Sequence, residues 1–102
     1  MKTISKLNQI LQKCKCGVYL SVNKYRDYYQ TIQEGIDDIN QSLSSSGSDF
    51  LSEEMTNKMI EHNKIIDLQF YPDTPIGSYS IYHYDLEMAL DKALDILNNL
   101  NK

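Results

Sequence analysis

The sequence predicts an α/β (α+β) fold in a single domain, 1–102, with elements in the order α-β-α-α-β-β-α. Four segments carry apolar residues at three- and four-residue steps, which is the helical period. Three shorter segments are rich in β-branched and aromatic residues, as strands are. A chain of 102 residues with 41% hydrophobic content is long enough to bury one core without disulfides or metals.

The helical segments have recognisable start signals. Thr31 is followed three residues later by Glu34, which predicts a capping box. Ser52 precedes two acids, and Asp85 precedes the last apolar stripe, so both are expected to cap helix N-termini. The predicted helices span 3–14, 31–43, 52–62 and 86–100. The serine-rich segment 42–48 is expected to be a flexible linker inside the domain.

The strands are predicted at 18–22, 65–71 and 78–84, and the last two are joined by a loop, 72–77, with two prolines and a glycine. Because helices separate the first strand from the second, a parallel crossover is expected between them. The resulting three-stranded mixed sheet has the order 2-3-1, with the four helices covering one face. That topology would bring the segments 24–29 and 71–79 to the same edge, where α/β proteins tend to bind ligands.

Several classes of protein are disfavoured by the sequence. No window approaches 18 consecutive apolar residues, so no membrane span is expected. The N-terminus has no unbroken apolar stretch of a signal peptide, which favours a cytoplasmic protein. Cys14 and Cys16 are too close in sequence for an unstrained disulfide, so two free thiols are expected.

The charge is unevenly distributed. Residues 1–26 contain six basic groups and no acid, whereas 27–102 contain four basic groups and all fourteen acids. The basic and acidic segments either pair within one chain, meet between subunits of a homo-oligomer, or leave the basic segment for a phosphorylated ligand. The net charge of −4 argues against general nucleic-acid binding on electrostatic grounds.

Two segments are the candidate binding sites. The run 24–29 interleaves cations, which hold phosphate or carboxylate, with tyrosines, which stack on planar groups. The loop within 71–79 is stiffened by its prolines, which would pre-organise a binding surface. Each segment also has an ordinary structural explanation, as a cap on the core and as a hairpin turn respectively. The candidate residues are Lys24, Tyr25, Arg26, Tyr28, Tyr29, Tyr71, Asp73, Thr74 and Tyr79.

Catalytic, cofactor and metal sites are not expected. His62 and His83 lie 21 residues apart, which does not match the ligand spacing of zinc sites with Cys14 and Cys16. His83 is expected to pack between tyrosines, and His62 to end a helix. No phosphate-binding glycine loop or nucleophile motif is present in the sequence. The acids Glu87, Asp91 and Asp95 form a four-residue stripe, which is typical of a solvated helix face.

These patterns favour a small non-catalytic binding protein, expected to be a homo-oligomer. Its tyrosine-rich loops would grip a protein partner or an anionic, nucleotide-like small molecule. One alternative is a counter-defence inhibitor from a phage or mobile element, whose acidic surface docks on a host nuclease or immune effector. The other alternative is a small enzyme that uses Cys14 or Cys16 with His83.

Overall fold

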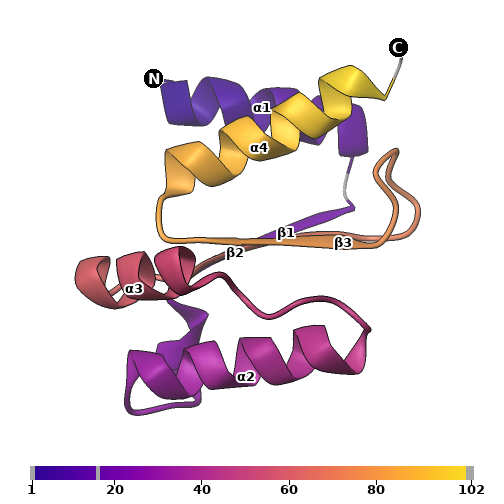
Figure 1. The fold of residues 1–102 in the computed structure, drawn as a ribbon. Helices are drawn as coiled ribbons and strands as arrows, with labels where there is room; N and C mark the ends of the chain where they lie inside the picture. The colour runs from indigo at the N-terminus through magenta and orange to yellow at the C-terminus, as the bar shows by residue number, and fades with distance from the viewer. Residues whose placement is uncertain (1, 16, 101–102) are drawn as a thin grey trace.

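The computed structural model describes residues 2–15 and 17–100 and has the α+β architecture that the sequence predicts. Its helices lie on both faces of a small antiparallel sheet (Figure 1). Most predicted boundaries agree with the structure to within one or two residues. The elements are α1 (Lys2–Cys14), β1 (Val18–Val22), the 3₁₀ helix η1 (Lys24–Asp27), α2 (Ile32–Ser45), α3 (Glu53–His62), β2 (Ile66–Phe70), β3 (Tyr79–His83) and α4 (Leu86–Asn99).

The predicted N-caps of α2, α3 and α4 are confirmed. The side-chain oxygens of Thr31, Ser52 and Asp85 accept hydrogen bonds from the backbone N–H groups three residues later. Each bond satisfies a donor that the first helical turn cannot pair internally. The predicted linker is partly wrong, because α2 continues through Ser45 and only the residues after it form a loop before α3.

The predicted strand order 2-3-1 is wrong, since the sheet has the order β1-β2-β3 and both strand pairs are antiparallel. Val22 at the end of β1 pairs with Ile66 at the start of β2. The cause is a reversal at Asn23, whose backbone is left-handed with φ 58°. Its N–H donates to the Ile65 carbonyl and its Oδ1 accepts from the Ile65 N–H, both at 2.8 Å. The helices between β1 and β2 therefore return the chain to the end of the sheet where β1 finishes, instead of carrying it across the sheet to the other end.

The two faces of the sheet differ in polarity. Ile66, Leu68 and Phe70 of β2 are buried against α1 and α4, whereas the alternate residues Asp67 and Gln69 face the other way, toward α2. Figure 1 shows α1 and α4 on one side of the sheet and α2 on the other, so the expectation that helices cover one face is also wrong. The apolar face carries the larger core, and the polar face leaves room for a cleft.

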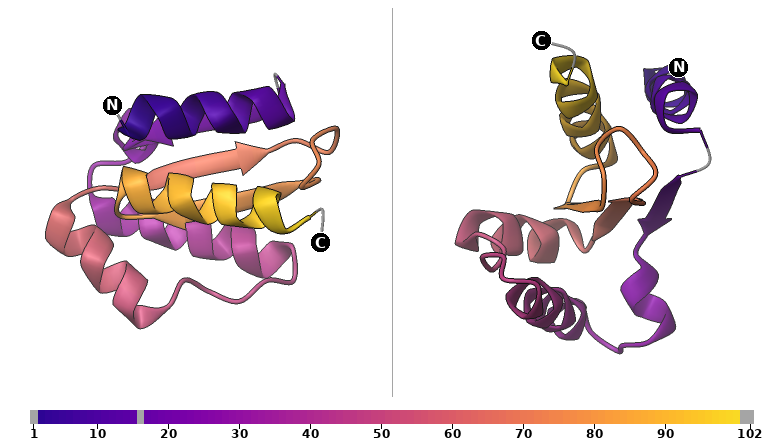
Figure 2. Two further views of the ribbon diagram at one scale, coloured as in Figure 1. Left: turned by 90° about the horizontal axis from the view of Figure 1, so that it is seen from above. Right: turned by 90° about the vertical axis from the view of Figure 1, so that its right-hand side faces the viewer.

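The basic N-terminal helix and the acidic C-terminal helix lie side by side over the apolar face of the sheet (Figure 2). The Lys6 Nζ lies 2.7 Å from a carboxylate oxygen of Glu87 and 2.7 Å from one of Asp91. The Thr3 hydroxyl also donates to Glu87. These contacts favour the arrangement in which the basic N-terminal segment pairs with acids of the same chain. Because the Glu87 and Asp91 side chains keep 39% and 58% of their surface exposed, these ion pairs add little to stability.

A second, smaller core holds α2 and α3 under the sheet. It consists of Tyr25, Ile36, Met59 and Ile65. Tyr25 joins three elements, because its hydroxyl donates to the Oδ1 of Asn63 at the end of α3 (2.9 Å) while its Cβ lies against Gly35 of α2. A Cβ at position 35 would lie 2.6 Å from that Cβ, closer than real carbon atoms approach.

We expect Gly35→Ala to destabilise the fold. Overpacking costs about 1–3 kcal/mol, and the better helix propensity of alanine returns about 1 kcal/mol, so the unfolding free energy should fall by about 1 kcal/mol. Urea unfolding measures it. The control is Gln41→Ala, at an exposed position of the same helix, which should change stability by less than about 0.5 kcal/mol. A Gly35→Ala variant as stable as this control would contradict the close packing of Tyr25.

Candidate functional site

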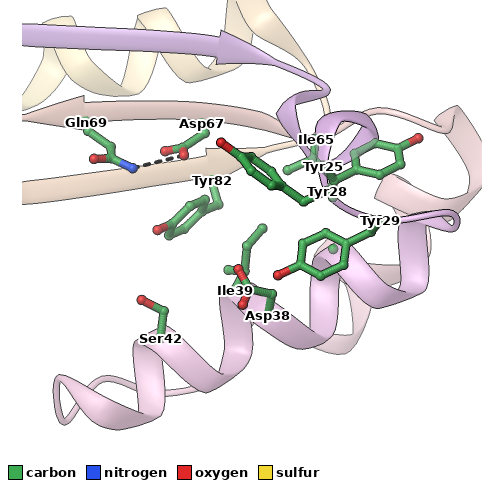
Figure 3. A pocket seen from close by; sticks show the side chains of 11 residues that line it. Tyr25, Tyr28, Tyr29, Asp38, Ile39, Ser42, Ile65, Asp67, Gln69 and Tyr82 are labelled. Carbon is green, nitrogen blue, oxygen red and sulfur yellow. Dashed lines mark hydrogen bonds between the residues drawn. The ribbon is translucent and has the colours of Figure 1, made fainter.

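A cleft of about 370 Å³ opens between the polar face of the sheet and α2. We call it the tyrosine cleft, because four of its eleven lining residues are tyrosines (Figure 3). Its size falls within the range of small-molecule sites in proteins. The lining residues are Tyr25, Tyr28, Tyr29, Gly35, Asp38, Ile39, Ser42, Ile65, Asp67, Gln69 and Tyr82.

The sheet supplies the polar wall of the tyrosine cleft. Asp67 and Gln69 project from the central strand β2, and Tyr82 stands directly opposite Asp67 on β3. The Gln69 Nε2 donates to Asp67 Oδ2 at 2.9 Å, which orients the half-buried carboxylate (Figure 3). Because side chains alternate along a strand, these three lie on the face of the sheet away from the larger core, where polar groups are accommodated.

The segment after β1 supplies one end of the cleft. Tyr25 is buried, whereas Tyr28 keeps 71% of its surface exposed and extends over the mouth of the cleft. The Tyr29 N–H donates to the Tyr25 carbonyl at 2.7 Å, so the short helix η1 fixes the spacing of the tyrosines. The rings of Tyr28 and Tyr29 are tilted by 58° with their centroids 6.4 Å apart. Rigid aromatic side chains held in this way offer contact area at low entropic cost.

Helix α2 forms the opposite wall through Asp38, Ile39 and Ser42. A hydrogen bond from the Tyr29 hydroxyl to Asp38, with a smaller contribution from burial, raises the pKa of Tyr29 above its ordinary value. A second hollow of about 420 Å³ adjoins the first, since both are lined by Ser42 and Tyr82. It continues past Ser80 and Tyr79 of β3.

Four of the nine predicted site residues line the tyrosine cleft or the hollow beside it. Tyr25, Tyr28 and Tyr29 meet in the tyrosine cleft, and Tyr79 lines the adjoining hollow. Arg26 lies near the cleft, with its guanidinium carbon 6.0 Å from the centroid of the Tyr25 ring. The side chain of Lys24 lies outside the part of the structure that is described.

The predicted convergence of 24–29 with 71–79 is wrong. Because β1 and β2 are antiparallel, η1 follows one end of β1 while the hairpin loop leaves β2 at the other, about 13 Å away along the strands. Tyr71 donates its N–H to the Gly17 carbonyl at 2.9 Å, so the loop packs beside the residues that precede β1. Thr74 is buried there, and its hydroxyl donates to the Tyr71 carbonyl. Tyr71, Asp73 and Thr74 thus lie away from the cleft.

Sequence reasoning missed the residues that complete the cleft, namely Asp38, Ser42, Asp67, Gln69 and Tyr82. The signal for two of them was present. Asp67 and Gln69 alternate with Ile66, Leu68 and Phe70, and such alternation in a central strand indicates a sheet with one polar face. The positions of Asp38 and Ser42 depend on where α2 lies, which no local pattern in the sequence indicates.

No known protein family, curated protein or solved structure matched this chain. The function must therefore be argued from the site itself.

Cys14 and His83, the described residues of the enzyme alternative, are buried and half-buried respectively. Cys14 lies in the main core, where burial raises the pKa of its thiol and disfavours the thiolate. The Nδ1 of His83 accepts the Asp85 N–H at 3.0 Å, and burial, the larger effect, lowers the pKa of the imidazole. His83 packs against Tyr84, which also stacks on His62 at the end of α3. Cys16 lies outside the described residues.

Among residues 2–15 and 17–100, no three or more His, Cys, Asp or Glu side chains are grouped so that they could hold a metal ion. None of the helices described there combines the length and the apolar character that a membrane span requires.

We expect Asp38→Asn to lower the pKa of Tyr29 toward its ordinary value, 10.0. Only the protonated hydroxyl donates to Asp38, so the stabilisation exists below pH 10 and is lost as the pH rises through the higher pKa of the folded protein. A ¹³Cζ NMR titration of the tyrosines measures the pKa. Asp37→Asn, which removes the adjacent charge, is the control and should shift it much less. Equal shifts in both variants would rule out the specific hydrogen bond.

Proposed function

We propose that this chain is a non-catalytic binding protein that holds a small molecule in the tyrosine cleft. The observation that carries the proposal is the convergence of aromatic and polar side chains from the sheet, η1 and α2 on one concave site. A mixture of aromatic walls and a few placed polar groups is what small-molecule sites use for affinity and orientation. The adjoining serine-lined hollow gives a longer ligand room to continue along β3.

The other proposals have less support. The buried Cys14 thiol is a poor nucleophile, which weighs against an enzyme based on that residue with His83. Docking of an acidic surface on a host protein would draw on α4, but Glu87 and Asp91 of that helix pair with Lys6. A protein partner and a homo-oligomer remain predictions from the sequence.

The proposal is tested by titrating the ¹⁵N-labelled protein with three chemically distinct probes: spermidine, ADP and glucose. At least one should give saturable shift changes at residues of the tyrosine cleft. Tyr28→Ala should weaken that binding about fivefold, because a stacked aromatic ring contributes on the order of 1 kcal/mol. Tyr28 is largely exposed, so the fold should be kept.

The matched control is Tyr71→Ala, another exposed tyrosine, at the opposite end of the strands. It should leave binding unchanged. Equal losses in the two variants would contradict the assignment of the cleft, as would shifts centred on 71–77. The absence of saturable cleft shifts with all three probes would contradict the function itself.

A further inference from the structure

The tyrosine cleft and the hollow beside it lie end to end between α2 and the sheet. Ser42 and Tyr82 line both spaces, so the two meet at these residues. The cleft, of about 370 Å³, lies toward η1, and the hollow, of about 420 Å³, extends toward the start of β3. We call the two together the long groove. A ligand that fills it must be longer than it is wide.

Polar side chains recur at regular intervals along both walls of the long groove. Ser78, Ser80 and Tyr82 are two residues apart in and just before β3, which is the period that keeps side chains on one face of a strand. Asp38 and Ser42 are four residues apart on α2, which places them on one face of the helix. Figure 3 shows Ser42 and Asp38 on α2 across from Tyr82 on the sheet. The groove therefore offers hydrogen-bonding groups at successive points along its length.

A ligand can reach these groups. The side chains of Ser42, Ser78 and Ser80 are exposed, and each hydroxyl can donate one hydrogen bond and accept two. The Ser46 hydroxyl, also in the hollow, donates to the Leu43 carbonyl at 3.0 Å, which leaves its oxygen as an acceptor. A carboxylate accepts at several positions, so Asp38 can bind Tyr29 and still accept from a ligand. Donors and acceptors are thus mixed along the groove, as a ligand with repeated hydroxyl groups requires.

An aromatic ring stands at one end of the long groove. Tyr28 is 71% exposed and extends over the mouth of the tyrosine cleft, where its ring is tilted by 58° against that of Tyr29. A pyranose ring has an apolar C–H face and a rim of hydroxyl groups, so it can stack on an aromatic face while its rim forms hydrogen bonds. A linear polyol lacks the apolar face, and a bare aromatic ligand lacks the hydroxyl groups. A sugar chain has both.

We propose that the long groove binds a short oligosaccharide, with one sugar ring against Tyr28 in the tyrosine cleft and the next rings along Ser42 and Ser80. This inference rests on the proposed binding function and names a saccharide in place of the nucleotide-like small molecule that the sequence favours. The serine-lined hollow supplies the hydrogen bonds to the second and later rings.

The experiment titrates the ¹⁵N-labelled protein with glucose, with three trisaccharides (maltotriose, cellotriose and triacetylchitotriose), and with sorbitol, which has hydroxyl groups but no ring. At least one trisaccharide should give saturable shifts in the long groove and bind at least about tenfold more tightly than glucose, because its added rings form further hydrogen bonds in the hollow. Sorbitol should bind more weakly than glucose. Sorbitol binding as tight as that of glucose, or trisaccharides that bind no more tightly than glucose, would overturn the inference.

Matched variants locate the bound trisaccharide. Ser42→Ala should weaken its binding about fivefold, the effect of one lost hydrogen bond. The control is Ser44→Ala, an exposed serine of the same helix that does not line the groove, and it should leave binding unchanged. Ser80→Ala should weaken the trisaccharide more than glucose, since Ser80 lines only the hollow. Tyr28→Phe keeps the ring and should retain most of the binding that Tyr28→Ala loses. Equal effects of Ser42→Ala and Ser44→Ala would contradict the assigned groove.

The failure of this inference can be told from the failure of the proposed function. If ADP or spermidine gave saturable cleft shifts that Tyr28→Ala weakens, while every saccharide failed to bind, the cleft would remain a ligand site and the oligosaccharide would be overturned. The absence of saturable cleft shifts with the saccharides, ADP and spermidine alike would overturn both. Saccharide shifts centred on 71–77 would also overturn both, because the ligand would then lie at the other end of the strands.

Discussion

The junction between Asn23 and Ile65 determines the arrangement of the rest of the molecule. Two 2.8 Å hydrogen bonds connect these residues, one through the backbone and one through the Asn23 side chain. Asparagine tolerates the left-handed backbone that the reversal requires. With the end of β1 tied to the start of β2, the strands must run antiparallel, and the intervening helices must stay on one face. The position of α2 under the sheet is a consequence of this junction.

The cleft exists because the layer beneath the sheet is held at one end. Tyr25 links η1 to α3 through Asn63 and packs its Cβ on Gly35, so α2 is anchored near its N-terminus. Its later residues Asp38 and Ser42 face the polar side chains of the sheet across the cleft. A smaller residue at position 25 would remove this anchor. The same tyrosine therefore serves the second core and the wall of the site.

Local structure was predictable where a residue acts on its own neighbours. Thr31, Ser52 and Asp85 cap helices through bonds to groups three residues away, and such bonds follow from the sequence. The strand order was not predictable in the same way, because it depends on contacts between Asn23 and a residue 42 positions later. The predicted site residues show the same difference between local contacts and contacts that depend on topology. The tyrosines of 24–29 lie together as neighbours, whereas Tyr71 and Thr74 lie elsewhere because the topology differs.

The distribution of charge takes on a different meaning in the folded chain. Part of the basic N-terminal excess is used against α4, where Lys6 contacts two acids. The acids Asp38 and Asp67 lie on the other side of the sheet, away from those cations. A run of tyrosines beside Lys24 and Arg26 favours an anionic ligand when it is considered alone. In the fold, the same tyrosines share the cleft with Asp38 from α2 and Asp67 from β2. The groups that surround a site are therefore decided by which elements the topology brings together, and a local run of residues is a poor guide to them.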